Sequence, residues 1–130
     1  YSQIERLAFM AFFEREHAVF CRNLEAQIAE PTLKALVGRI ARDEERHEEF
    51  FANLVSHLLT TSRDETITAI ARRAAELDVV GGDIAAYADK IAHMADAGIF
   101  GPEQLRSVIA DRITAWGLAD EPELKQFTRR

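Results

Sequence analysis

This sequence has a single cysteine and lacks both clustered basic residues and long apolar runs. Cys21 is the single cysteine among 130 residues, so the chain cannot form an internal disulfide, which suits a reducing cytoplasm. The net charge is -6 and no basic stripe stands out, which argues against a nucleic-acid partner. No apolar run approaches the roughly 18 residues of a membrane span. We therefore predict a cytoplasmic protein without a transmembrane segment.

Strand-like alternation, internal repeats and low-complexity linkers are also missing. Apolar residues make up 48% of the chain and charged residues 29%, a balance typical of a folded domain. The apolar residues recur at helical spacing, so we predict an all-α fold in which residues 1–130 belong to a single domain. Because the chain begins with Tyr1 and the helical pattern runs already from Ile4 without a convincing cap, we expect a piece of a longer protein.

Proline and capping residues divide the chain into a long helical hairpin, residues 1–61, and shorter packing helices, residues 62–130. Pro31 suits the first turn of the second helix. Ser62 opens a Ser-Arg-Asp-Glu sequence with the spacing of a capping box, and Asp83 is a candidate N-cap further on. The expected helices are about 2–29, 31–59, 63–78, 84–97 and 102–116, with a last short turn at 122–127.

The second expected helix has an apolar seam that contains one acid and one base, Glu44 and His47. The seam residues are separated alternately by four and three positions, which is typical of the buried face of a helix in a bundle. An ionised carboxylate is costly to bury unless it is paired, hydrogen-bonded or bound to a metal. Glu44 and His47 therefore need partners, whereas Glu45, Glu48 and Glu49 are expected on a solvated face. The seam consists of Leu33, Val37, Ile40, Glu44, His47, Phe51, Leu54 and Leu58.

The first expected helix repeats this pattern with Glu14 and His17 inside an apolar seam. A short connection at Pro31 makes the two helices antiparallel neighbours. Glu14 and Glu44 each lie about 15 residues from the turn, which places both roughly 22 Å from it. The two carboxylates are therefore expected at the same level on facing seams. The seam of the first helix consists of Leu7, Met10, Glu14, His17, Cys21, Leu24 and Ile28.

A Glu-x-x-His pair facing a Glu on a neighbouring helix is the ligand arrangement of di-iron sites in helical bundles. We therefore predict Glu14, Glu44 and His47 as metal ligands and assign no catalytic side chain. Two alternatives remain open: Glu44 pairs with Arg15 or Arg42, and His47 bonds to Asp43 or to another helix. His17 is either a further ligand or lines the cavity beside the metals. Cys21 is interpreted as a small core residue rather than a nucleophile.

Two sequence motifs resemble the second half of the soluble acyl-(acyl carrier protein) desaturases, most of all their mycobacterial desaturase-like members. The first is Phe13-Glu14-Arg15, and the second is Asp43-Glu44-Glu45-Arg46-His47-Glu48. The likeness continues through Asp89, Gly98-Ile99-Phe100 and Trp116 and covers essentially the whole chain.

The resemblance implies a ferritin-like bundle, of which this chain would be the C-terminal part, and a di-iron centre. It further implies an oxygen-dependent enzyme, a homodimer, that places a double bond in an acyl chain held on acyl carrier protein, with a donor such as ferredoxin supplying electrons. By position, Glu14 is the lone Glu of its helix, Glu44 a bridging ligand, His47 a terminal ligand and Asp43 an acid that orients a ligand without touching the metal. The remaining ligands would come from a preceding half, so this chain holds half of a site and is expected to be inactive alone.

His17 stands where the family usually has a small hydroxyl residue, and an imidazole there could ligate metal, block oxygen or redirect its chemistry. Two other functions compete with desaturation. Two copies of the Glu14/Glu44/His47 hairpin could pair into a ferroxidase or iron-storage site, because together they supply four Glu and two His. Alternatively, the chain is a non-catalytic desaturase-like bundle. Acyl chain length and double-bond position are not encoded in these residues.

Overall fold

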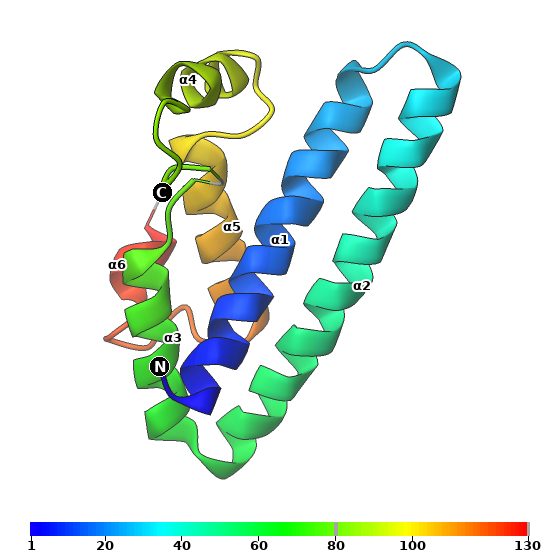
Figure 1. Ribbon diagram of the computed structural model, residues 1–130. Coiled ribbons are helices and arrows are strands. Elements are labelled where there is room, and N and C mark those ends of the chain that lie inside the picture. The colour runs from blue at the N-terminus through cyan, green and yellow to red at the C-terminus, as the bar shows by residue number, and fades with distance from the viewer. Residues whose placement is uncertain (80, 130) are drawn as a thin grey trace.

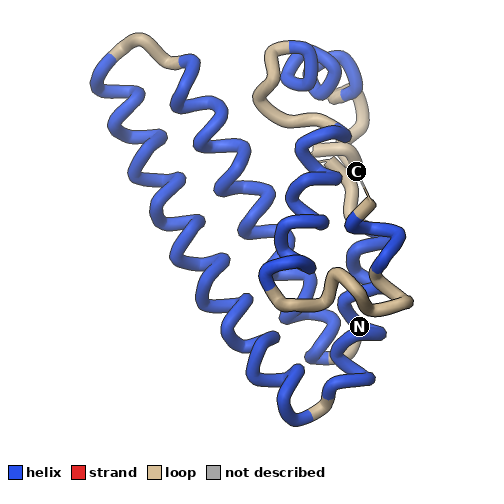
Figure 2. Tube along the Cα trace, turned by 180° about the vertical axis from the view of Figure 1, so that it is seen from behind, coloured by secondary structure: helices blue, strands red, loops and turns tan. Residues whose placement is uncertain are grey.

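The computed structural model describes residues 1–79 and 81–129, and within them it contains helices and no strands. This confirms the predicted all-α fold. Two long helices, α1 and α2, run antiparallel side by side, and α3, α5 and α6 lie on the other side of α1 (Figure 1). Seen from behind, the α1–α2 turn and α4 lie at the same end of the molecule (Figure 2). The helices are α1 (Gln3–Gln27), α2 (Pro31–Thr61), α3 (Arg63–Glu76), α4 (Ala88–Asp96), α5 (Pro102–Ala115) and α6 (Lys125–Thr128).

Local chemistry fixes the starts of both long helices and corrects one expectation at the start of α1. The Ser2 hydroxyl accepts a bond from the Glu5 amide at 3.1 Å, and the Glu5 carboxylate accepts one from the Ser2 amide at 2.9 Å. This is a complete capping box, so the expectation of an uncapped start was wrong. At α2, the Glu30 carboxylate accepts bonds from the amides of Thr32 and Leu33, with Pro31 in the first turn.

The capping box predicted at Ser62 does not form. The Ser62 side chain makes no capping bond, because this single residue joins two helices and its backbone serves both. Its amide donates to the Leu58 carbonyl at 2.7 Å, and its carbonyl accepts from the Thr66 amide at 3.0 Å. The fourth helix begins at Ala88 rather than near residue 84, and Asp83 is not its cap. Ala86 has a φ of 67°, a left-handed conformation that interrupts a helix.

The core lies where α1 meets α2, α3 and α5. Alanines on α1 and α2 let the two long helices approach closely, and Phe12 of α1 fills the space toward Trp116 at the end of α5. The two rings meet edge to face, with centroids 5.7 Å apart, and the Trp116 indole N–H donates to the Ala52 carbonyl at 3.1 Å. The buried residues of this core are Ala8, Ala11, Phe12, Ala52, Val55, Leu59, Ile67, Ile70, Ala74, Ile109, Ile113, Trp116, Leu118 and Leu124.

The buried face of each long helix is shifted by one residue from the predicted seam. On α2, Leu33, Ile40, His47 and Leu54 are exposed, and the residues after three of them are buried instead. One residue corresponds to a rotation of about 100° around the helix axis. Small side chains such as those of Ala11 and Ala41 occupy much of the buried face, whereas the larger seam residues Leu33, Ile40 and Leu54 of α2 are exposed. The buried residues are Ala8, Ala11, Phe12, Glu16 and Ala18 on α1, besides the capping residue Glu5, and Val37, Ala41, Glu48, Ala52, Val55 and Leu59 on α2.

Candidate metal centre

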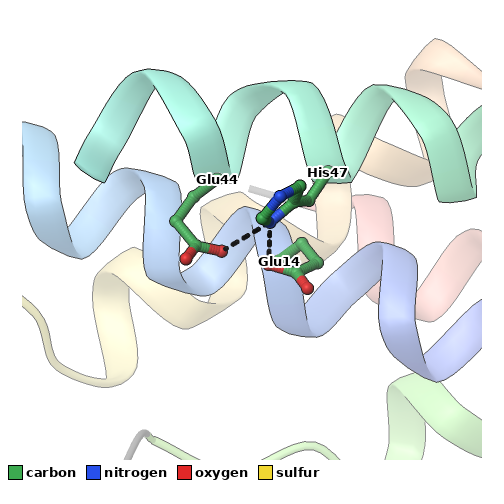
Figure 3. A group of neighbouring side chains, drawn as sticks. All are labelled: Glu14, Glu44 and His47. Atoms are coloured by element: carbon green, nitrogen blue, oxygen red, sulfur yellow. Dashed lines mark ion pairs between the residues drawn. The ribbon is translucent and has the colours of Figure 1, made fainter. Parts of the chain in front are cut away.

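The structure brings Glu14, Glu44 and His47 together, although they lie on two helices. The Nδ1 atom of His47 is 3.7 Å from a carboxylate oxygen of Glu14 and 3.6 Å from one of Glu44. Figure 3 shows the two carboxylates reaching the same imidazole from α1 and α2. Each of the three residues offers one ligand atom within 4.8 Å of the others. The equal distance of Glu14 and Glu44 from the turn thus does place them at one level of the hairpin.

Electrostatics in this group favour a bound cation. Burial, followed by the neighbouring Glu44 carboxyl, raises the pKa of Glu14 from its ordinary value of 4.5 to about 7, and His47 offsets part of this effect. Two carboxylates in one partly buried site repel each other unless one is protonated or a cation lies between them. A divalent ion would therefore replace the proton that Glu14 otherwise retains.

The three side chains fit a metal ion by their donor chemistry and spacing. Donor atoms lie roughly 2.0–2.2 Å from a bound transition metal, so two donors on one ion are about 3 Å apart. The observed distances of 3.6 and 3.7 Å need only small side-chain movements to reach this value. Carboxylates combined with imidazole suit iron, manganese and zinc. Glu14, Glu44 and His47 thus offer three donor groups to a metal ion, and further ligands would be required to complete its coordination.

Exposure increases across the group from α1 to α2. The side chains of Glu14, Glu44 and His47 are 12%, 23% and 55% exposed, respectively. The expectation that His47 is buried was therefore wrong for the described chain, because His47 lies on the face of α2 that is turned away from α3 and α5. The site is open on one side, so a ligand or a further polypeptide can reach it.

His17 and Cys21 continue the same face of α1 beyond Glu14 but lie outside the group of three. The Nδ1 atom of His17 is 2.8 Å from the Phe13 carbonyl oxygen, which can only accept, so Nδ1 carries the proton and Nε2 is the free ring nitrogen. Burial, and then the charge of Glu44, raise the pKa of the Cys21 thiol. The thiol is therefore held in its neutral, unreactive form, in line with the interpretation of Cys21 as a structural residue.

Of the alternative partners, Arg15 and Asp43 are engaged elsewhere and Arg42 is exposed, whereas His47 does meet another helix, through Glu14 of α1. Arg15 contacts Glu48 and Asp111. The Asp43 side chain is 63% exposed and lies 3.9 Å from Arg46, so the structure does not direct it toward the His47 ring. Glu45 and Glu49 are exposed as expected.

Glu48, expected in solvent, is 8% exposed and lies in a buried ion cluster that the sequence analysis missed. One of its carboxylate oxygens is 2.7 Å from Arg112 and the other is 3.4 Å from Arg15. Arg15 also reaches Asp111 at 3.2 Å. A signal was present in the sequence: one residue after the seam of each long helix runs a second seam of small residues, and Arg15 and Glu48 stand in it.

Glu16 is a second buried acid that the sequence analysis missed. It is 2% exposed, and burial, with a further contribution from the charge of Asp78, raises its pKa from 4.5 to about 8. The carboxyl group is therefore neutral at physiological pH. Glu16 lies two residues after Glu14 but faces the core rather than the open side of the hairpin.

The all-helical fold and the Glu14–Glu44–His47 group are consistent with one protein family, and a comparison with family models identifies it. The family model for fatty acid desaturases matches residues 2–130, and the chain belongs to that family. Across the described residues, no helix is long and apolar enough to cross a membrane.

Individual relatives narrow the assignment. The chain is 69% identical over 127 residues to DesA2 of Mycobacterium tuberculosis, which carries the provisional name acyl-(acyl carrier protein) desaturase. The aligned region covers 98% of this chain and 46% of that protein. It is 31% identical over 123 residues to the chloroplastic acyl-(acyl carrier protein) desaturase 7 of rice, covering 86% of this chain and 30% of the relative.

A solved structure shows the same fold. The X-ray structure of Mycobacterium tuberculosis DesA2 superposes with a TM-score of 0.98 at 68% identity and covers 99% of this chain and 53% of that one. The family resemblance found in the sequence is thus confirmed, and the chain spans about half the length of the mycobacterial relative.

Proposed function

We propose that this chain is the C-terminal part of one ferritin-like domain of an oxygen-dependent di-iron acyl-(acyl carrier protein) desaturase, in fatty acid biosynthesis. The observation that carries the proposal is the convergence of Glu14, Glu44 and His47 on one position between α1 and α2. Family membership supports it, because the same residues stand in the motifs that resemble the desaturases.

Glu14, Glu44 and His47 would supply half of the ligands of two iron ions. When iron is bound, the centre would provide the redox chemistry by which oxygen accepts two electrons from a donor and two hydrogen atoms from the acyl chain. Two protons then complete two waters, and a carbon–carbon double bond is left in the chain. In this scheme the two carboxylates balance the charge of the cations, and His47 adds a neutral donor.

Acyl carrier protein bearing the acyl chain and an electron donor such as ferredoxin belong to the same proposal. So do a homodimeric assembly, a cytoplasmic location and completion of the site by a preceding half. The family resemblance supports each of them. Self-assembly of two hairpins into a ferroxidase is less favoured, because the match to the desaturase family model extends through the later helices to residue 130.

Iron content tests the proposal directly. We expect Glu44→Ala and Glu14→Ala to reduce the iron bound by the complete desaturase to less than half, because each variant removes a carboxylate between the cations. Glu49→Ala is the matched control, since Glu49 lies on the same helix but is exposed. Unchanged iron content in Glu44→Ala would rule out the site. Two irons per pair of 130-residue chains, without any preceding half, would favour the ferroxidase alternative.

A further inference from the structure

The two candidate ligands Glu14 and His47 are each followed by a residue of the buried ion cluster. Arg15 follows Glu14 on α1, and Glu48 follows His47 on α2. Consecutive residues are separated by about 100° around a helix. One side of the hairpin therefore carries the ligands, and the adjacent side carries the ion pairs that join the same two turns of helix.

Glu48 is the centre of this cluster and connects three helices. Its carboxylate contacts Arg15 of α1 and Arg112 of α5, at 3.4 and 2.7 Å, while the side chain itself is only 10% exposed. Arg112 also lies over the Trp116 ring, with its guanidinium carbon 4.9 Å from the ring centroid. Trp116 in turn donates to the carbonyl of Ala52, one turn after Glu48. Helix α5 thus holds α2 at two successive turns.

The ion cluster fixes the rotation of α1 and α2 about their axes, in addition to attracting the two helices to each other. A buried carboxylate between two guanidinium groups tolerates little displacement, since a small rotation of either long helix leaves a charge unpaired in a poorly solvated place. The apolar packing of the two long helices is less directional than an ion pair, and several of their buried residues are alanines with small side chains. The side chain of His47 is 55% exposed, so little packing holds its ring beyond the two carboxylates near its Nδ1 atom.

The two guanidinium groups of the cluster do not use all of their hydrogen-bond donors. Among the described residues, buried Nε atoms without a hydrogen-bond partner occur in Arg15 and Arg112 of the cluster and in Arg73 outside it. In the cluster, each guanidinium is aimed through its terminal nitrogens at Glu48 or Asp111 instead.

We propose that Glu48, held between Arg15 and Arg112, is a positioning residue that fixes the rotation of α1 and α2 so that Glu14, Glu44 and His47 converge. That this rotation serves metal binding rests on the function proposed above. That Glu48 fixes the rotation rests on its ion pairs alone. Glu48 itself is assigned no contact with metal or substrate.

The decisive variant is Glu48→Gln, which keeps the shape of the side chain and removes its charge. Glu45→Gln is the matched control, since Glu45 also joins α2 to α1, through Arg22 at 2.5 Å, but its side chain is 44% exposed. Ile113→Val in α5 is a second control, because it weakens the core without touching the ions. All variants are compared at a temperature well below their unfolding transitions, with helix content followed by circular dichroism.

Two readouts separate positioning from stability. In NMR spectra of the 130-residue chain, we expect nuclear Overhauser contacts between the His47 ring and the Glu14 methylene protons. These contacts should weaken at least threefold in Glu48→Gln and persist in both controls. In titrations with Co²⁺ alone, followed by its visible absorption, we expect the dissociation constant to rise at least tenfold in Glu48→Gln and less than twofold in the controls.

Folded Glu48→Gln with unchanged contacts and unchanged Co²⁺ affinity would overturn the inference. Should Glu48→Gln fail to fold, Arg15→Lys replaces it, because lysine keeps the charge but cannot reach Glu48 and Asp111 together; it must show the same two losses for the inference to stand. If the wild-type chain binds no Co²⁺ while its His47 contacts still depend on Glu48, the metal function fails and the positioning role holds.

Discussion

Glu16 offers a test of how much the ionisation of a buried carboxyl group destabilises this protein. The side chain is 2% exposed, and burial, together with the charge of Asp78, raises its pKa from 4.5 to about 8. Replacing Glu16 with glutamine retains the shape of the neutral acid and removes its ionisation. The variant therefore separates the contribution of this one group from all other pH effects.

The sign of the effect follows from the direction of the pKa shift. A carboxyl whose pKa is higher in the folded state binds its proton more tightly there, so its stabilisation is complete below about pH 4.5 and is lost as the pH rises toward 8. Each pH unit in that interval changes the free energy of unfolding by about 1.4 kcal/mol. Between about pH 5 and pH 8 the wild-type chain should lose about 4 kcal/mol through Glu16, and relaxation around the charge reduces this to an expected loss of at least about 2 kcal/mol.

Urea unfolding at pH 5, 6, 7 and 8, followed by circular dichroism, measures this difference. We expect Glu16→Gln to match the wild type near pH 5 and to exceed its stability by at least about 2 kcal/mol at pH 8. Glu49→Gln is the control for a Glu→Gln change at an exposed position. Wild-type and Glu16→Gln stabilities that run parallel from pH 5 to pH 8 would refute the reasoning, because Glu16 would then ionise as it does in the unfolded chain.

Three further substitutions probe the core, a cap and a turn by thermal or urea unfolding. Phe12→Ala should cost about 3–5 kcal/mol because it empties a fully buried site beside Trp116, whereas Phe50→Ala, at a ring that is 60% exposed, should cost much less; equal costs would contradict the described core. Ser2→Ala should cost about 1 kcal/mol through loss of the α1 capping box, and no loss would show that the box does not hold in solution. Gly117→Ala should cost about 1–2 kcal/mol, because Gly117 has a φ of 76°, and a neutral result would mean that the turn adopts another conformation.

The sequence predicted the hairpin and the meeting of Glu14 with Glu44 because both follow from counting residues along helices of fixed rise. Helix ends marked by strong local signals were also predictable, such as Pro31 at the start of α2. Gly98 ends α4 with a φ of 75°, and the Ile99 amide donates to the Met94 carbonyl at 3.0 Å, as expected for a glycine C-cap.

The rotation of each long helix could not be predicted in the same way. Two seams run side by side on α2, one with larger apolar residues such as Ile40 and one with small residues such as Ala41. Hydrophobicity favours the first, but close packing against α1 selects the second. Because Glu48 lies in the second seam, its burial depends on Arg112, which is 64 residues away in sequence and is brought close only by the complete fold.

The burial of Glu16 could not be predicted from the sequence for a related reason. Its neighbourhood is created by the end of α3 and the approach of Asp78, and neither is encoded near Glu16 in the chain. The metal-ligand assignment of Glu14, Glu44 and His47 stays a prediction until iron content is measured in their variants.

Ser62 joins the end of α2 directly to the start of α3. Its amide closes the last turn of α2, while its carbonyl accepts bonds from both the amide and the hydroxyl of Thr66 in the first turn of α3. No spacer separates the two helices, so a change in the backbone angles of Ser62 disturbs the last turn of α2 and the first turn of α3 together. We expect the amides of Ser62 and Thr66 to show the same free energy of opening in deuterium exchange, as one cooperative unit. Inserting a few glycines after Ser62 should uncouple their free energies of opening, even if both helices persist.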